Sequence, residues 1–564
     1  MGLFTRILEL PISIFTIILN LDFTLIFTLF IIYSVFQTYF NFYRKRHERF
    51  PGPVPLPFIG HLYLFIGNFA ATSSRLNEKF GDTYEFSMFG YRTVVLANPK
   101  DLNDLFSAKV DSPFLRRIPP FKGIKALGME SDGLLFNNNV PKWKHNRKYF
   151  SQSLSPPSFI KLSAIYTNQA CEELFGYWSN LKQNEIVKLD EWFRSFTSDM
   201  MGLVVSGVKE NSMQLTNDKR VKANSKHSLR VNEDAKEKNH EITSGEIYRN
   251  LRSEYSDALG FLVFVPTFLW NFPLIKPKVE HYKNVLKELG KFELELINER
   301  KITMMKQQPD VNSVNSNNSK VKADFLTMLL TSTDDADVIK QNIREMFGAG
   351  IATTTSTLCA IVHHLAKHPE VEKRMVDELF RVLGSNQNVK VEDFDKLKFT
   401  EAVINETIRL NPVVPLVHRY STDTELEIAG RLFPPNTIFG INLAHIQRNP
   451  KYFPNPETFD PDRFYTENCA ENCAENCTEH RKDQLPKYAF SPFGQGMRSC
   501  PGKNFAMAEI KTILANIYRK YTFQLAYPNK PLPWRYTVVN EIGTFEVFVV
   551  PRENSGCILP NSAA

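Results

Sequence analysis

One cysteine near the carboxyl end of the chain, Cys500, constrains the fold more than any other residue. It lies in the stretch FGQGMRSCPG at 493–502, and a helical pattern from Lys503 to Tyr518 follows directly. A thiolate is a strong metal ligand, and its anion is stabilised by a following helix N-terminus and by a nearby cation. Gly496 permits a tight turn with positive φ, and Gly502 lets the backbone approach a flat cofactor closely. Together these features describe a loop that holds a heme iron from one side through cysteine.

The same stretch carries a family resemblance. Phe493, Gly496, Arg498, Cys500 and Gly502 stand at the spacing of the heme-binding loop of the cytochrome P-450 family, which this chain resembles. A buried cysteine at a glycine-rich helix entry is the alternative interpretation, and the five matched positions speak against it. The resemblance implies heme b (iron protoporphyrin IX) with Cys500 as its axial thiolate ligand. It also implies that Phe493 shields the sulfur and that Arg498 holds a propionate.

Length alone suggests two to four domains, whereas the resemblance implies one large catalytic domain. The chain has 564 residues, of which 43% are hydrophobic, and this is ample for a large core. The resemblance covers about residues 45–552 and implies a single domain at 51–564, mainly helical with small β-sheets at one edge. A net charge of +7 is mild and does not indicate a nucleic-acid partner, whereas it suits a redox partner or an anionic membrane surface. Seven scattered cysteines form no disulfide-like framework, which favours a reducing compartment.

Residues 1–50 are predicted to anchor the chain in a membrane. The apolar run Phe23–Tyr43 is long enough for a helix across about 30 Å of hydrocarbon. Basic residues crowd positions 44–49, and by the positive-inside rule they leave the downstream chain in the cytosol. A cleavable signal peptide is the alternative, but it needs a shorter apolar region and a small-residue cleavage site. Prolines at every second position of 51–57 then form an extended connector. The resemblance implies a single pass through the endoplasmic reticulum membrane.

A second motif lies in the first third of the chain. Trp143 and Arg147 are four residues apart in a helical pattern, so they share one face. An indole N–H and a guanidinium suit a carboxylate, although alone such a pair is typically a solvated cation–π contact. In the context of the resemblance, this helix matches the one that binds a heme propionate. Lys144 and Lys148 on the same helix, with Lys503 beside the cysteine loop, are predicted to form a basic docking face for the reductase.

The segment FGAGIATTT, which ends at Thr355, resembles the oxygen-binding helix of the family. Small residues followed by threonines weaken a helix centre, because a threonine hydroxyl competes for backbone carbonyls. A small-residue packing face in a core helix is the alternative for this segment alone. The matched positions are Ala349, Gly350, Thr353 and Thr354. The resemblance implies that Thr353 steadies the distal oxygen. The acid position of the family pattern holds Ala352, so the usual carboxylate for proton delivery is absent.

Three later residues resemble a structural triad of the family. Glu406 and Arg409 are three residues apart within the helical pattern Thr400–Leu410, and Arg463 follows in the stretch FDPDRF. An exposed pair of this kind contributes only a few tenths of a kcal/mol, so the pair alone indicates little. The order Glu–Arg–Arg ahead of the cysteine loop resembles the triad that locks the scaffold behind the cysteine.

Two strand regions are predicted to line a substrate pocket. Residues 412–419 form an apolar strand pattern, and Arg419 at its end matches a position that reaches a propionate, with His418 as the less favoured substitute. Residues 531–551 alternate like β-strands around a turn at Asn540–Gly543 and are expected to form a later wall of the pocket.

Three polar, low-complexity segments are predicted to be insertions, at about 209–246, 307–321 and 466–482. The first is expected to be a long mobile loop. The third repeats Glu-Asn-Cys, and its cysteines would share one face of a helix, which suggests a metal site. A surface insertion without a metal is the alternative and the better account of the repeat.

The resemblance implies a monooxygenase. Electrons from NADPH, delivered by a membrane NADPH–cytochrome reductase, reduce the iron, and one atom of O2 is inserted into a lipophilic substrate. Apolar access beside a membrane favours a lipid-like or terpenoid substrate. Two alternatives stay open: a heme-thiolate isomerase or dehydratase that acts on peroxides without O2 or reductase, and a membrane-anchored heme sensor. The sensor is less favoured, because it needs an output region and only a short tail follows residue 552.

Overall fold

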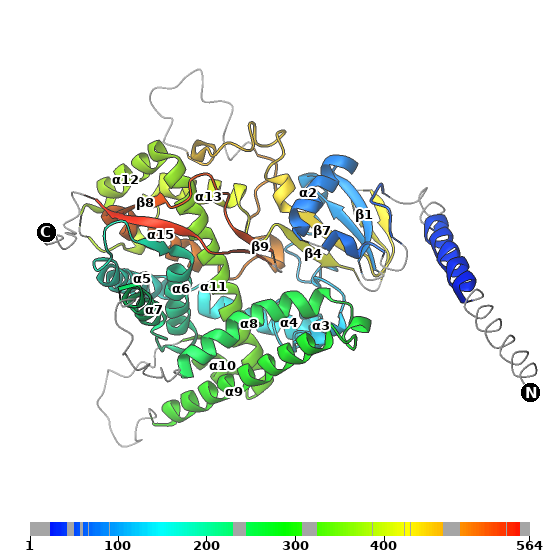
Figure 1. Ribbon diagram of the computed structural model, residues 1–564, viewed down its shortest axis with the longest axis horizontal. Coiled ribbons are helices and arrows are strands. Elements are labelled where there is room, and N and C mark those ends of the chain that lie inside the picture. Colours follow the sequence, from blue (N-terminus) through cyan, green and yellow to red (C-terminus); the bar gives the residue numbers. More distant parts are fainter. Residues whose placement is uncertain are drawn as a thin grey trace, which may run out of the picture.

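The computed structural model describes residues 23–41, 50–56, 60–65, 67–88, 91–228, 244–306, 324–385, 387–421, 424–428, 430–465, 485–536 and 539–552. Helices dominate this part of the chain and small sheets accompany them (Figure 1), which confirms the predicted fold class. The helices are α2 (Phe69–Phe80), α3 (Lys122–Ala126), α4 (Val140–Leu154), α5 (Pro157–Trp178), α6 (Leu189–Ser206), α7 (Ser212–Ser228), α8 (Ser244–Phe264), α9 (Lys276–Lys306), α10 (Phe325–Ser332), α11 (Ala336–Lys367), α12 (Pro369–Leu383), α13 (Lys398–Leu410), α14 (Leu443–Ile446) and α15 (Lys503–Lys520).

The long helix α11 runs through the middle of the domain (Figure 1), and other helices pack around it. Asp335 caps its N-terminus, because its side chain accepts hydrogen bonds from the amides of Asp337 and Val338. Helix α6 packs along α11. The side chain of Met201 on α6 packs directly against Gly350, where a Cβ would lie only 2.5 Å from the Met201 sulfur. Gly350 therefore serves helix packing, which is the alternative role weighed for this segment.

Four short sheets complete the domain. The largest has the order β1 (Thr83–Met88), β2 (Tyr91–Leu96), β7 (Ile438–Asn442), β4 (Leu416–Tyr420), and only β2 and β7 pair in parallel. It lies at the edge of the domain that carries α2 (Figure 1). The others are β3 (Ile186–Lys188), β11 (Glu546–Pro551), β8 (Tyr521–Leu525); β5 (Leu426–Ile428), β6 (Arg431–Phe433); and β9 (Trp534–Tyr536), β10 (Asn540–Ile542). The parallel pair joins segments more than 340 positions apart and so fixes β4 beside the N-terminal part of the domain.

The prediction of one long loop at 209–246 is wrong for its first half, because Ser212–Ser228 is helix α7. The sequence there has little apolar periodicity, and the helix is started by a tertiary contact. The carboxylate of Asp199 on α6 accepts the amides of Ser212 (2.6 Å) and Met213 (3.1 Å). Two amides at the N-terminus of α7 are thus satisfied by a neighbouring helix. Residues 229–243 lie outside the described residues, and α8 begins at Ser244.

The predicted turn at Asn540–Gly543 is also wrong, because Asn540–Ile542 is strand β10. Contacts with distant segments extend the backbone here. The amide of Asn540 donates to the Val413 carbonyl (2.8 Å), and the amide of Ile542 donates to the Ser356 hydroxyl on α11 (3.0 Å). The insertions predicted at 307–321 and 466–482, with the repeated cysteines, lie outside the described residues.

An apolar helix at Phe23–Asn41 precedes the domain, within the predicted span Phe23–Tyr43. Its mean hydropathy is 1.7, and none of its membrane-length window is buried. Helix α11 also has the length and composition to cross a membrane, but 72% of its window is buried, as in the core helix of a soluble domain. Of these two helices, Phe23–Asn41 is therefore the candidate for the anchor.

Candidate functional site

The cysteine loop is shaped by two glycines with positive φ, Gly494 at 66° and Gly496 at 68°. A Cβ on Gly496 would lie 2.3 Å from the Phe106 carbonyl oxygen, so only glycine fits this turn. The amide of Cys500 donates to the carbonyl of Phe493 (2.8 Å), which closes the loop just before α15 begins at Lys503. Phe493 itself is partly buried against the main hydrophobic core.

Cys500 is exposed as a residue, yet protein atoms surround its thiol closely. Burial raises the pKa of the Cys500 thiol. The Gly502 amide and the cations Arg147, Arg117 and Lys503 lower this pKa, but their effect is smaller than that of burial. The helix N-terminus and the cations therefore act as the sequence predicts, although alone they do not make this cysteine a thiolate. A metal ion bound at the sulfur would do so, because a coordinating thiol is deprotonated outright.

Four buried or half-buried guanidinium groups gather beside this loop, those of Arg117, Arg147, Arg419 and Arg498. Burial and, to a smaller extent, repulsion from Arg117 lower the pKa of Arg419 to about 9. Burial also lowers the pKa of Arg498, as do Arg117 and Arg419. The acids that act on these arginines are Glu345 and Cys500, so positive charge is in excess among the described residues.

Each predicted arginine reaches the site from a different element. Arg147 of α4 donates to the carbonyl of Ser499 at 2.7 Å, directly before Cys500. Arg419 of β4 donates to the carbonyl of Leu105 at 3.1 Å. Arg498 lies over the ring of Trp143, with 4.3 Å between the guanidinium carbon and the ring centroid. It also donates to the carbonyls of three residues, Leu115, Leu134 and Asn137.

Arg117 is a member of this cluster that the sequence did not reveal. It lies in the region 112–139, whose only visible signals were irregular composition and an arginine pair ahead of two prolines. The structure brings it to the site because the amide of Tyr420 donates to the carbonyl of Arg116 at 2.9 Å. This bond joins the Arg117 segment to β4, the strand that carries His418 and Arg419.

Three buried donors in the cluster lack hydrogen-bond partners within the described part of the chain. They are Trp143 Nε1, Arg117 Nε and His418 Nε2. Burial, with repulsion from Arg117 and Arg419, lowers the pKa of His418 to about 4, so this ring is neutral at pH 7. Buried donors are normally satisfied, and unpaired guanidinium groups are costly. A ligand with two carboxylates beside Cys500 would satisfy both needs, and the two propionates of heme have this chemistry.

Helix α11 presents a short open stripe within its buried length. Gly348 and Ala349 are exposed and Thr353 is half-buried, whereas Ala352 is only 4% exposed. The hydroxyl of Thr353 donates to the carbonyl of Ala349 at 2.7 Å, which leaves the oxygen of that hydroxyl able to accept a hydrogen bond. The side chain at position 352 is thus turned into the interior, away from the stripe that holds Thr353.

Glu406, Arg409 and Arg463 meet in the core beside α13. Arg409 binds Glu406 through two nitrogens, at 2.7 and 2.8 Å, and neither side chain is exposed. Arg463 lies 3.4 Å from the same carboxylate. The amide of Asp460 donates to Glu406 as well, at 2.9 Å. Arg409 further donates to the carbonyls of Gln447 and Thr458. This network ties α13 to the segment 447–463 ahead of the cysteine loop, and breaking a buried pair costs about 3–5 kcal/mol.

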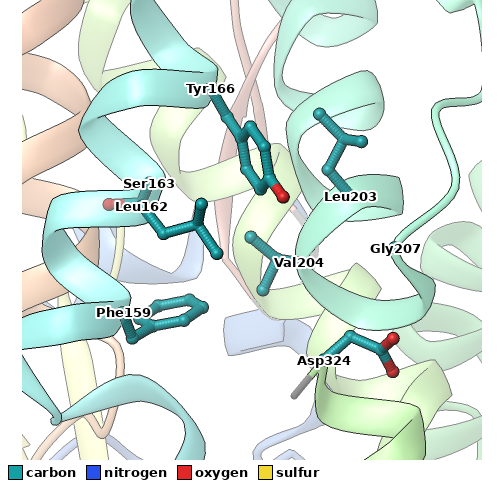
Figure 2. Close-up of a pocket in the computed structure, with 8 residues that line it drawn as sticks. All are labelled: Phe159, Leu162, Ser163, Tyr166, Leu203, Val204, Gly207 and Asp324. Atoms are coloured by element: carbon teal, nitrogen blue, oxygen red, sulfur yellow. The ribbon is translucent and has the colours of Figure 1, made fainter. Parts of the chain in front are cut away.

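A small pocket elsewhere in the domain contains none of the predicted site residues. Figure 2 shows it between α5 and the end of α6, with Asp324 at one side and mostly apolar side chains around it. Asp324 is paired with Arg300 at 3.0 Å and caps α10 through the amide of Thr327. Its carboxylate is therefore engaged in structure. No group of three or more His, Cys, Asp or Glu side chains suitable for a metal occurs among the described residues.

Comparison with known proteins places these features in one family. A family model described as Cytochrome P450 matches residues 50–547. Cytochrome P450 4d2 of Drosophila melanogaster is 26% identical, over 85% of this chain and 89% of the relative. Cytochrome P450 3A9 of Rattus norvegicus is 23% identical, over 84% and 85%. Methyltetrahydroprotoberberine 14-monooxygenase of Papaver somniferum is 25% identical, over 88% and 90%.

Proposed function

Because the chain belongs to the cytochrome P450 family, whose members are heme-thiolate monooxygenases, we propose that NADPH supplies its electrons through a membrane flavoprotein reductase and that its substrate is lipophilic, of the lipid or terpenoid type. One atom of O2 is inserted into that substrate. The observation that carries the proposal is the excess of buried guanidinium groups and unpaired donors beside Cys500.

In this proposal Cys500 is the axial ligand of heme b. Trp143, Arg117, Arg147 and Arg419 bind its propionates, because their donors converge beside the cysteine loop. Arg498 takes part through its remaining N–H groups, since three of its nitrogens already donate to backbone carbonyls. When bound, the heme iron supplies the one-electron chemistry and the activation of O2. The protein orients the group, excludes water and moves protons.

Proton delivery is proposed to run through Thr353 and water. The Thr353 oxygen accepts a hydrogen bond at the open stripe of α11, and a general acid can act through one water molecule. Ala352 cannot contribute a proton, so water, Thr354 or a substrate group must supply it. The same alanine favours a second candidate function, a heme-thiolate isomerase or dehydratase of peroxides, which needs neither reductase nor O2.

Membrane association supports a lipophilic substrate. The helix Phe23–Asn41 is apolar and exposed along its length. The connection between α8 and α9 adds a cluster of exposed apolar side chains, Phe268 (76%), Phe272 (52%) and Leu274 (85%). Such exposed patches are typical of surfaces that meet lipid or partners. We place the protein in the endoplasmic reticulum membrane, spanned once, with the domain in the cytosol.

The heme-thiolate assignment is tested by Cys500→Ala. This variant should lose the thiolate signature in the spectrum of the reduced carbon-monoxide complex, and activity with it. The controls are Cys171→Ala and Cys359→Ala, which remove buried thiols on α5 and α11 and should leave the signature unchanged. A thiolate spectrum that survives in Cys500→Ala would contradict the proposal.

The reaction class is tested by comparing substrate conversion with and without O2, NADPH and reductase. A monooxygenase requires all three. Conversion of a lipid hydroperoxide or endoperoxide in their absence, with no oxidised product when they are supplied to unoxidised lipids, would instead establish the isomerase.

A further inference from the structure

Glu345 on α11 is buried, only 8% exposed, and it lies eight residues before Thr353. One oxygen of its carboxylate accepts the amides of Leu134 at 2.5 Å and Leu135 at 3.0 Å. Gln341 donates to the other oxygen at 3.2 Å. A Cβ on Gly133 would lie 2.1 Å from this carboxylate, so the backbone of segment 131–138 rests directly on it. Glu345 thus satisfies two half-buried amides of a loop that has no regular structure.

The same segment is held from its other side by the cysteine loop. Arg498 donates to the carbonyl of Leu134 at 2.7 Å and to that of Asn137 at 3.1 Å. Leu134 therefore gives its N–H to Glu345 and its C=O to Arg498. Arg498 lies two residues before Cys500. Leu134 consequently links α11 to the cysteine loop.

Other side chains hold carbonyls of this segment but not these amides. Asn146 of α4 donates to the carbonyls of Asp132 (2.9 Å) and Gly133 (2.8 Å). Asn342 of α11 donates to the Asp132 carbonyl at 3.2 Å. Among the described residues, Glu345 is the side chain that accepts the amides of Leu134 and Leu135. Its removal would leave these two half-buried amides without their acceptor, and an unsatisfied amide destabilises the loop conformation.

Glu345 is also the carboxyl group whose charge acts on both Arg117 and Arg498. Burial raises its pKa, whereas the amides of Leu134 and Leu135, the Gln341 side chain and Arg117 lower it and so favour the charged form. These two arginines repel each other and Arg419 within the cluster. A buried carboxylate beside them offsets part of that repulsion, because Coulomb interactions are strong where water is excluded.

We propose that Glu345 is a positioning residue that fixes segment 131–138 between α11 and the cysteine loop and balances the charge of Arg117 and Arg498 around the heme. This inference rests on the proposed heme site. It predicts that changes at Glu345 alter heme retention and heme potential, with no contact between Glu345 and the substrate required.

Two variants separate charge from geometry. Glu345→Gln removes the charge but keeps one side-chain oxygen, which can still accept the hydrogen bonds of the Leu134 and Leu135 amides. The NH2 group that it introduces faces Gln341, whose own amide group can reverse and present its oxygen. We expect this variant to retain heme. The ferrous-to-ferric ratio at a fixed electrode potential should rise about threefold or more, because removing a nearby negative charge stabilises the ferrous state. Glu345→Ala removes the acceptor, so hydrogen exchange at the amides of Leu134 and Leu135 should accelerate about tenfold or more. Heme transfer to excess apomyoglobin should also become faster.

The matched control is Glu293→Gln. Glu293 is fully buried on α9 and binds Arg344, the neighbour of Glu345 in sequence, at 2.9 and 2.5 Å. This variant should lower thermal stability without changing heme potential or exchange at Leu134 and Leu135. If the Glu345 variants match Glu293→Gln in potential, heme transfer and amide exchange, the role of Glu345 is overturned. If the unmodified holoenzyme lacks the thiolate spectrum, the proposed heme site itself fails, which is a separate result.

Discussion

Ala352 lies one residue before Thr353, and its methyl group is buried whereas the Thr353 hydroxyl lies at the open stripe of α11. A carboxylate introduced at 352 would enter the interior, where an unpaired charge is costly. Protonation at the stripe must therefore depend on groups that the chain places elsewhere, or on water.

Ala352→Asp tests this dependence. We expect its free energy of unfolding to fall by about 1–3 kcal/mol, because a polar group is buried. Turnover should change by less than about tenfold, because in the proposed route protons already arrive through water, and coupling of NADPH to product should stay the same or improve. Ala352→Asn is the control of similar size without an acidic proton. If Ala352→Asp and Ala352→Asn couple NADPH to product equally well, the carboxyl group is not the cause of any improvement over the unmodified protein.

Glu509 on α15 is a second residue with a measurable consequence. It is 2% exposed, and its Oε1 has no hydrogen-bond partner among the described residues. Burial raises the pKa of its carboxyl to about 8. The unfolded chain loses this proton near pH 4.3, whereas the folded protein keeps it up to about pH 8. Unfolding therefore releases a proton between these values, and stability falls as pH rises through this window.

Glu509→Gln should remove this pH dependence. The free energy of unfolding of the unmodified protein should fall between pH 6 and pH 8. In the variant this fall should be smaller by about 1 kcal/mol or more per pH unit. Thermal-unfolding midpoints at the two pH values measure it. Glu378→Gln is the control, because Glu378 is equally buried but accepts hydrogen bonds from Phe399 and Thr400, so the variant should lose stability at both pH values. An unaltered pH response in Glu509→Gln would contradict the prediction.

At the scale of elements, α8 and the β9–β10 hairpin flank the open stripe of α11. Tyr255 of α8 comes within 3.9 Å of the position of a Cβ on Gly348, and Ile542 of β10 binds Ser356 of α11. Asp257 of α8 and Arg535 of β9 form an exposed ion pair at 2.6 Å that joins the two flanking elements. Exposed pairs contribute less than about 1 kcal/mol, which is enough to shift a gating equilibrium a few-fold.

Asp257→Asn should speed ligand entry with little effect on stability. We expect the association rate of a lipophilic azole, followed by the shift in heme absorbance, to rise about two- to fivefold at low salt. The charge swap Asp257→Arg with Arg535→Asp should restore the original rate. Glu457→Gln removes another exposed pair, with Arg448 at 2.6 Å, and should leave the rate unchanged. An unchanged rate in Asp257→Asn would show that this pair does not restrict entry.

At the scale of the whole molecule, positive charge lies close to the cysteine loop. Lys148 and Lys503 are exposed and Lys144 is half-buried, around the helix that carries Arg147. An acidic reductase surface would be steered toward this face, because electrostatic attraction increases the rate of encounter.

Reversing these charges should slow electron transfer. We expect Lys144→Glu/Lys148→Glu/Lys503→Glu to lower the rate of heme reduction about tenfold at low ionic strength and to flatten its salt dependence. Stopped-flow reduction by the reductase under carbon monoxide measures it. Lys148→Glu alone can be compared with Lys287→Glu, an exposed position on α9 with the same change of charge. Equal rates in these two variants would place the docking site elsewhere.

Much of this protein follows from patterns within short stretches of sequence. The glycines of the cysteine loop permit positive φ at little cost, and both Gly494 and Gly496 adopt it. The spacing of Trp143 and Arg147 on a helix, and of Glu406 and Arg409, sets which side chains share a face before any tertiary contact forms. The mainly helical class follows from the family resemblance of these motifs, and the apolar N-terminal helix follows from composition.

Only the tertiary structure decided what lies between these motifs. Helix α7 begins where Asp199 caps it and has no local signal. The alternation at 531–551 predicts strands, but contacts with Val413 and Ser356 make Asn540–Ile542 a strand rather than the predicted turn. Arg117 and Glu345 join the site through contacts with segments about 210 to 380 positions away. These contacts involve the largely irregular segment 112–139, which has no periodicity from which they could be predicted. Local sequence determines which backbone angles and helix faces are available. The charges around Cys500 come together only when five separate segments fold, those that carry Arg117, Arg147, Glu345, Arg419 and Arg498.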